Sequence, residues 1–210
     1  MNFLRRHWFD LGGFLFLVTI TMVYIFRKEL DPIHWILWIS LASLFLHQLE
    51  EYRIIGTFPG MINKVLFSSP NPDRYPLNME TAFWVNVGMG WTSYFLAALF
   101  AEKAIWLGIA TILVSIGNFM AHTLFFNLKG KTWFNAGMLT SILLFLPISY
   151  FFFEILNKEG LGTLNNYALG IPLGIALNYF GILKLIDWLK NKDSPYPFPR
   201  RCLLPPEIRP

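Results

Sequence analysis

The chain has little charge and almost no cysteine. Asp, Glu, Lys and Arg make up 14% of its 210 residues, and hydrophobic residues make up 55%. A soluble domain averages about 25% charged residues, so this chain has too little polar surface to face water on all sides. We therefore expect an integral membrane protein whose main partner is the lipid bilayer. The single cysteine, Cys202, excludes an internal disulfide and a thiolate metal cluster.

Three further features are missing from the sequence: a basic stripe, a Gly-rich phosphate loop and an internal repeat. The 17 Lys and Arg against 13 Asp and Glu give a net charge of +4. Because the basic residues are scattered over loops, we expect no nucleic-acid partner. Many transporters are built from repeats and broken helix pairs, so the missing repeat argues against that class.

Apolar stretches of the right length dominate the rest of the chain. About 20 apolar residues cross the roughly 30 Å of hydrocarbon in a bilayer. We expect an all-α, polytopic bundle of about six transmembrane helices, near residues 11–26, 33–52, 81–101, 104–126, 136–156 and 167–188. Asp31 is a predicted N-cap, followed by Pro32 at the first helical position, and Asn78 is a second predicted N-cap. The first stretch has no small-residue cleavage site, so we expect it to be retained.

The positions of Lys and Arg predict the orientation of this bundle. Cytoplasmic loops carry an excess of these residues. If the N-terminus is inside, only four of the 17 lie outside, namely Arg27, Lys28, Lys103 and Lys158. Both termini are therefore expected to be cytoplasmic, in a multi-pass protein of the cell (inner) membrane. We expect one transmembrane domain over 1–190, with the cytoplasmic loop 53–80 as a candidate lid, and a Pro-rich, extended cytoplasmic tail over 191–210.

The polar residues of the predicted spans fall into one layer near the cytoplasmic side. At 1.5 Å per residue, His47 lies about 6 to 9 Å inside its helix end. Counting along the other spans brings further polar residues to a similar depth. The layer contains His47, Glu50, Glu51, Asn86, Asn118, His122 and Asn135. The outer half of the bundle offers little comparable.

The spacing within this layer is typical of a metal site. Residues three and four apart share a face of a helix, so Glu50 and Glu51 both flank His47. Imidazole nitrogens and carboxylate oxygens suit Zn²⁺, or non-haem iron in a two-His, one-carboxylate arrangement. We predict that His47, His122 and one of the two glutamates, with Glu51 preferred over Glu50, hold a divalent metal, with zinc preferred and iron as the alternative.

The remaining residues of the layer receive catalytic roles in this interpretation. Whichever of Glu50 and Glu51 does not bind metal would act as a general base. Asn86 and Asn118 would orient water, substrate or ligands. The ordinary reading stays open: the glutamates would pair with Arg53 or Arg74 at a helix end, and the asparagines would join neighbouring helices.

Motif order adds a resemblance to a known family. "HQLEEY", then "GNFMAH", then "TWFNAGMLTSILLFLP" resembles the HXXEE-domain family, which is regarded as a family of integral membrane enzymes. His47, Glu50 and Glu51 match the His-x-x-Glu-Glu motif, and His122 matches a second family histidine. The family's Tyr-x-Pro-Gly motif aligns with residues 134–137, where only Gly137 agrees. The resemblance covers about residues 33 to 150 and supports the same candidate residues.

These observations predict a metal-dependent membrane hydrolase. A site in the inner layer of the membrane points to a lipid or another small hydrophobic substrate at the cytoplasmic leaflet. Two alternatives remain at this point: a proton- or cation-coupled transporter that uses His47, Glu50 and His122, and a non-catalytic membrane scaffold.

Overall fold

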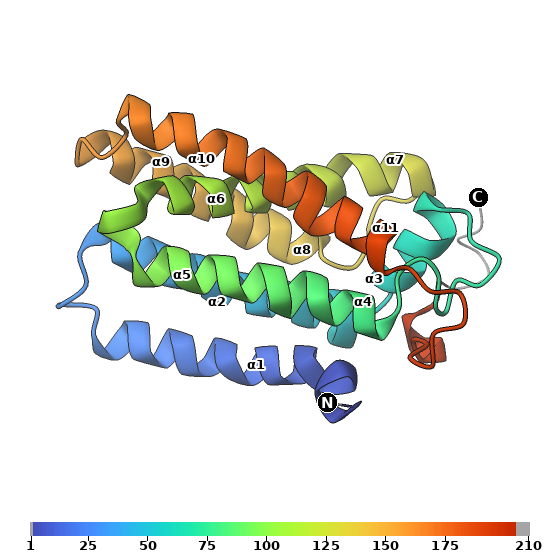
Figure 1. The fold of residues 1–210 in the computed structure, drawn as a ribbon. Helices are drawn as coiled ribbons and strands as arrows, with labels where there is room; N and C mark the ends of the chain where they lie inside the picture. The colour runs from blue at the N-terminus through green and yellow to red at the C-terminus, as the bar shows by residue number, and fades with distance from the viewer. Residues whose placement is uncertain (1, 205–210) are drawn as a thin grey trace.

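The computed structural model describes residues 2–204, and these residues form a bundle of long helices. Figure 1 shows the helices lying roughly parallel along one axis and joined mostly by short connections. No strand forms within the described residues. Alternate helices run in opposite directions, so the first and last parts of the described chain meet at one end. There the Tyr196 hydroxyl donates a hydrogen bond of 2.9 Å to the Asn2 side chain.

Within residues 2–204, six continuous helical rods make up the bundle. The first is α1 (Asn2–Ile25), and the second joins α2 (Pro32–Leu49) to the π-helical η1 (Glu50–Ile54). The third contains α4 (Met79–Phe83), η3 (Trp84–Trp91) and α5 (Thr92–Leu99). The fourth contains η4 (Ala101–Ala104), α6 (Ile105–Met120), η5 (Ala121–Phe125) and α7 (Phe126–Gly130). The fifth contains α8 (Met138–Thr140), η6 (Ser141–Phe145) and α9 (Leu146–Lys158), and the sixth α10 (Leu164–Ala176), η7 (Leu177–Lys184) and α11 (Leu185–Leu189).

Five of these rods are long and apolar enough to cross a membrane: Asn2–Ile25, Pro32–Ile54, Ala101–Gly130, Met138–Lys158 and Leu164–Leu189. The third rod, expected over 81–101, forms over 79–99 and is not among the five. The expected all-α membrane bundle is thus confirmed. The first rod begins at Asn2 rather than near residue 11.

The two predicted caps are confirmed. The Asp31 carboxylate accepts hydrogen bonds from the backbone N–H groups of Ile33 and His34 at the start of α2. The Asn78 side chain accepts from the N–H groups of Glu80 and Thr81 at the start of α4. Each cap satisfies donors that a helix N-terminus leaves without partners, and it therefore fixes where the helix begins.

The loop 53–80 and the described part of the tail, residues 191–204, pack together over one end of the bundle. The loop contains α3 (Phe58–Gly60) and the π-helical η2 (Met61–Leu66). The tail is largely extended over 191–204, with the short η8 (Arg200–Cys202); the rest of the expected tail lies outside the described residues. It packs on the loop, where the Phe198 N–H donates to the Asp73 carbonyl at 2.6 Å. Arg201 donates to the carbonyls of Tyr52 and Arg53 in η1. Because it packs in this way, the tail closes the end of the bundle on which the candidate site lies.

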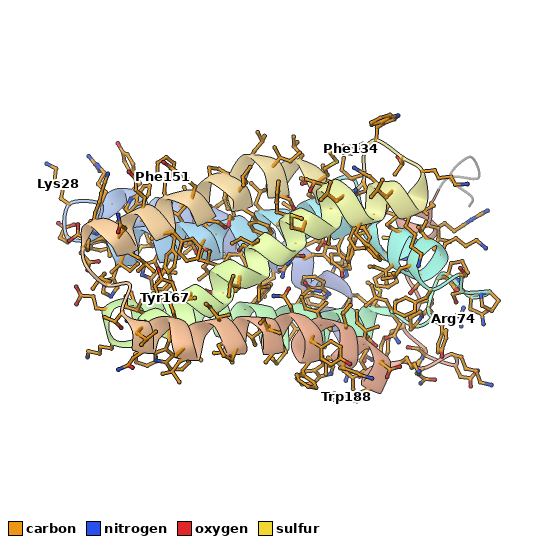
Figure 2. All side chains as sticks on the ribbon, turned by 90° about the horizontal axis from the view of Figure 1, so that it is seen from above. Lys28, Arg74, Phe134, Phe151, Tyr167 and Trp188 are labelled. Atoms are coloured by element: carbon orange, nitrogen blue, oxygen red, sulfur yellow. The ribbon has the colours of Figure 1, made fainter. Side chains whose placement is uncertain are left out.

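Close helix packing occurs where α10 crosses α6. A Cβ atom added to Gly170 would lie 2.7 Å from the Trp106 carbonyl oxygen, and one at Gly174 would lie 2.8 Å from Leu113 Cβ. Only glycine allows the backbones to approach this closely. Figure 2 shows α6 running obliquely from the end marked by Tyr167 to the end marked by Phe134, while α10 and its continuation run on to Trp188. The two rods therefore separate toward the end that the loop and tail cover.

Candidate metal centre

Three predicted ligands from two rods converge on one point. His47 and Glu51 lie one turn apart where α2 passes into η1, and His122 lies in η5. The Glu51 Oε1 atom is 3.5 Å from His47 Nε2 and 3.2 Å from His122 Nε2. The two imidazole planes are perpendicular, with ring centroids 5.0 Å apart. The three ligand atoms all lie within 4.8 Å of one another.

Both histidine Nε2 atoms lack hydrogen-bond partners among the described residues. Each atom is shielded from solvent, and both histidines are at most 2% exposed. Phe145 packs on the His47 ring, and Phe58 and Phe126 pack on the His122 ring. A buried polar atom without a partner costs free energy, so such atoms call for an explanation.

Thr140 determines the tautomer of His47. The Thr140 hydroxyl donates to Glu50 Oε2 at 2.6 Å. A hydroxyl has one proton, so its 2.9 Å contact with His47 Nδ1 requires the imidazole to donate. Because Nδ1 carries the proton, Nε2 of the neutral ring has a free lone pair, and this lone pair faces Glu51.

Asn135 does the same for His122. Its Nδ2 donates to the His122 carbonyl and to Asn127 Oδ1, both at 2.7 Å, which fixes the orientation of the amide. The Asn135 Oδ1 atom must then accept from His122 Nδ1, at 2.6 Å. His122 Nε2 is thus a second lone pair directed at Glu51. Two lone pairs and a carboxylate repel one another unless a cation or protons lie between them.

The two adjacent glutamates face different structures. Glu50 Oε1 accepts from the N–H groups of Gly137 and Leu139, and Oε2 accepts from the N–H and hydroxyl of Thr140. Each oxygen therefore has two donors. A carboxylate at a helix N-terminus is stabilised by such unpaired N–H groups. Glu50 holds the start of α8 against η1, while Glu51 faces the histidines.

Gly137 makes the close approach of these groups possible. Its φ of +98° is a conformation that favours glycine. A Cβ atom there would lie 2.9 Å from His47 Cε1 and in hard overlap with His122 Cε1. Any larger residue would therefore displace both imidazoles.

Comparison with protein families places these residues in a known group. A family model described as "Protein of unknown function with HXXEE motif" matches residues 38–152. The chain belongs to the HXXEE family. Neither the curated proteins nor the solved structures include a match. The matched range contains all three converging residues as well as Glu50 and Thr140.

In this member of the family the two glutamates of the HXXEE motif therefore contact different groups: Glu50 bonds the start of α8, and Glu51 faces the histidines. The pairing of Glu50 or Glu51 with Arg53 or Arg74, which the sequence left open, does not form: Arg53 pairs with Asp10, and Arg74 with Asp73.

Asn86 and Asn118 lie near the three converging residues, but their hydrogen bonds go to other groups. Asn86 accepts from Gln48 Nε2 at 3.0 Å and donates to the Tyr52 hydroxyl at 3.3 Å, while Gln48 accepts from Trp91. Asn118 donates to the Val114 carbonyl of its own helix. Both asparagines line a cavity of about 700 Å³ that His47 and Glu51 also line.

The sequence interpretation missed Thr140 and Gln48 and gave Gly137 no role. A positive φ cannot be read from a lone glycine, and a threonine in an apolar run is typical of helix packing. The motif "HQLEEY" did contain a usable pattern, because Gln48 and Tyr52 are one turn apart.

A second group of potential ligands lies at the other end of α2. It consists of Asp31, His34 and Glu102, which are all partly or fully exposed. Asp31 caps α2 and also bonds His34 Nδ1 at 2.5 Å. These local contacts explain the Asp31–His34 pair without a metal.

Proposed function

We propose that this HXXEE-family chain is a metal-dependent membrane enzyme, most simply a hydrolase. His47, Glu51 and His122 would hold a divalent cation, with zinc preferred over iron. The observation that carries the proposal is the pair of buried Nε2 lone pairs directed at one Glu51 oxygen. A cation between these atoms converts mutual repulsion into three favourable contacts.

The two distances from Glu51 to the imidazole nitrogens fit a zinc site. Ligand atoms about 2.0 to 2.1 Å from a tetrahedral zinc lie about 3.3 to 3.4 Å from one another. The observed separations from Glu51 Oε1 are 3.2 and 3.5 Å. Three protein ligands also leave a fourth position, as in catalytic rather than structural zinc sites. The polar groups behind the histidines, Thr140 and Asn135, are of the kind that orient metal-binding imidazoles.

The residues around the site suggest how a reaction would be divided among them. When bound, zinc would polarise a substrate carbonyl and activate water as a nucleophile at neutral pH. Glu51 lines the cavity and would take up the proton of water on its second oxygen. Glu50 is fully engaged by four donors, so it positions Thr140 and α8. Asn86 and Asn118, on the cavity wall, would orient the substrate.

The proposed location is the cytoplasmic leaflet of the cell membrane. The centre lies in the part of the bundle nearest the end where Asn2 and the tail meet. The excess of Lys and Arg at this end favours a cytoplasmic position. A lipid or another hydrophobic substrate would then reach the site from the inner leaflet.

The transporter alternative replaces the cation by protons on Glu51 or the histidines. Its difficulty is the outer half of the bundle, where an apolar cluster that includes Ile36, Leu37, Ile109 and Phe152 fills the interior. The scaffold alternative leaves the two lone pairs without a role. We therefore favour the enzyme.

Metal analysis of the purified protein tests the proposal. We expect about one equivalent of metal in the wild type, and its loss in His47→Ala, Glu51→Gln and His122→Ala. His7→Ala is the matched control, because His7 lies at the start of α1 and bonds Asp10 instead. Folded wild-type protein without metal, even after incubation with Zn²⁺ or Fe²⁺, would refute the proposal. Proton flux in vesicles would then support the transporter.

A further inference from the structure

The cavity beside the candidate metal centre is long and mostly apolar. It has a volume of about 700 Å³, within the range of pockets that hold small-molecule ligands. His47 and Glu51 lie on its wall, and most of the other lining residues are Leu, Ile, Val, Phe and Met. A cavity of this character matches a substrate that is apolar over most of its length.

One face of the last rod gives the length of the cavity. Ile171, Ile175, Asn178, Ile182 and Ile186 line it at spacings of three and four residues, so they share a helix face. Fifteen residues at 1.5 Å each extend about 22 Å. The cavity is thus elongated along the bundle axis, as a hydrocarbon chain in a bilayer is.

The cavity opens sideways, toward the position of lipid. Several of its large apolar lining residues are also exposed on the outside of the bundle, and three of them are Ile175 (63%), Leu183 (49%) and Phe125 (48%). They lie on the two rods that separate from each other beyond the Gly170 and Gly174 contacts (Figure 2). An opening lined by exposed apolar side chains, in a rod of membrane-spanning length, faces hydrocarbon rather than water.

Polar groups gather near the candidate centre. Gln48 and Asn86 form a hydrogen-bonded pair on the cavity wall, and Gln48 immediately follows His47 in α2. Further along the cavity, only a few polar side chains, such as Asn178, interrupt the apolar lining. The cavity therefore has a polar region for a headgroup and a long apolar part for a tail.

We propose that the substrate is a long-chain acyl ester or amide that enters sideways from the membrane between α6–η5 and α10–η7. The acyl chain occupies the apolar part, and the hydrolysable bond lies beside Glu51. This assignment rests on the proposed hydrolytic function. In the reaction the bond between the acyl carbon and its oxygen or nitrogen breaks, the hydroxyl of water joins the acyl carbon, and the proton goes to the leaving group. No oxidant or reductant is needed.

A photoreactive fatty acid tests the cavity directly. Palmitic acid with a diazirine in its chain is added to the full-length protein in lipid nanodiscs, and the labelled residues are located by mass spectrometry. We expect labels on cavity residues such as Ile182 and Met89, with palmitate competing better than octanoate. Each buried methylene is worth about 0.8 kcal/mol, so two more methylenes strengthen competition by about tenfold until the chain is fully enclosed.

A matched pair of variants distinguishes labelling inside the cavity from labelling of the outer surface. Ile182→Trp fills the cavity, whereas Leu169→Trp adds the same side chain to an exposed position of α10 that does not line it. We expect Ile182→Trp to reduce cavity labelling by about tenfold, the loss expected when about two methylenes are displaced. Leu169→Trp is expected to leave labelling unchanged, and both variants are expected to keep their metal.

Different results of these experiments would contradict the substrate inference and the proposed function. Labels confined to lipid-facing residues, or labelling that Ile182→Trp does not change, would overturn the inference even if metal is present. Faster hydrolysis of p-nitrophenyl butyrate than of the palmitate ester would overturn it as well. Cavity labelling in a protein without metal would instead overturn the proposed function, and with it the role of the bound chain as a substrate.

Discussion

His122 Nε2 lies 3.2 Å from Oε1 of Glu51, and in the neutral imidazole the hydrogen bond to Asn135 leaves no proton on the nitrogen that faces the carboxylate. His47 Nε2 faces the same carboxylate, also with a lone pair rather than a proton. In an interior shielded from water, such repulsion is costly. Replacement of Glu51 should therefore lower the metal affinity of the protein. It should not lower the free energy of unfolding of the metal-free form.

Glu51→Gln is expected to remove metal binding without unfolding the protein. The Gln amide can donate a proton to one Nε2 lone pair, so the metal-free variant should be at least as stable as the metal-free wild type. Thermal unfolding in detergent and metal analysis measure the two effects. A variant that unfolds would instead indicate that Glu51 serves helix packing.

Glu50→Gln is the matched change one residue earlier, and its expected effect is the reverse. The Gln nitrogen cannot accept from the backbone N–H groups or the Thr140 hydroxyl that now bond the carboxylate. Each lost bond to a charged acceptor costs about 1.5 to 3 kcal/mol. Thermal unfolding should therefore reveal a destabilisation of several kcal/mol. If Glu50→Gln unfolds like the wild type but loses all activity, Glu50 is the general base after all.

Thr140→Val tests whether the tautomer of His47 is set by its neighbour. The substitution keeps the shape and removes the hydroxyl between Glu50 and His47. Loss of such an orienting partner typically weakens metal binding by about 10- to 100-fold. Titration with a metal chelator measures the affinity. Thr111→Val is the control, because the Thr111 hydroxyl is also buried but bonds only carbonyls of its own helix.

Gly137→Ala separates backbone strain from crowding of the imidazoles. Gly160 also has a positive φ, of +66°, but a Cβ atom there would meet nothing within 4 Å. Gly160→Ala should therefore show only the strain of the left-handed conformation, about 1 to 2 kcal/mol. Gly137→Ala should cost more and also lower metal affinity. Equal effects of the two substitutions in unfolding and metal titration would show that Gly137 has no special relation to the histidines.

The features that the sequence predicts are those that depend on residues close together in the chain. The helices and the caps at Asp31 and Asn78 follow from apolar runs and from bonds within a few residues. The convergence of His47, Glu51 and His122 follows from counting depth along antiparallel spans, which requires only the helix rise.

The remaining features depend on contacts between distant parts of the chain. The role of Glu50 required knowledge that the start of α8, 87 to 90 residues later, lies beside it. Spacing on a helix placed Glu50 and Glu51 equally near His47, and only the neighbouring helix distinguishes them. The packing of the tail is similar, because Phe198 is buried against residues of the loop and of η1 that it does not adjoin in sequence.

Cys202 provides a probe for this packing of the tail. Its thiol is buried and lies outside the membrane-spanning rods. Burial raises the pKa of the Cys202 thiol, and the nearby Arg201 and Arg53 only partly offset the rise. The thiolate is the reactive form, so a raised pKa leaves less of it at a given pH, and alkylation by iodoacetamide at pH 8 should be slow in the folded protein. The rate should increase with pH, and it should rise sharply when the protein is unfolded in SDS.

Phe198→Ala, which removes a ring packed near Tyr52, should loosen the tail and speed alkylation without changing metal content. Fast alkylation of the native wild type would mean that the tail leaves this end of the bundle open, and the covered end that we describe for the candidate centre would be wrong.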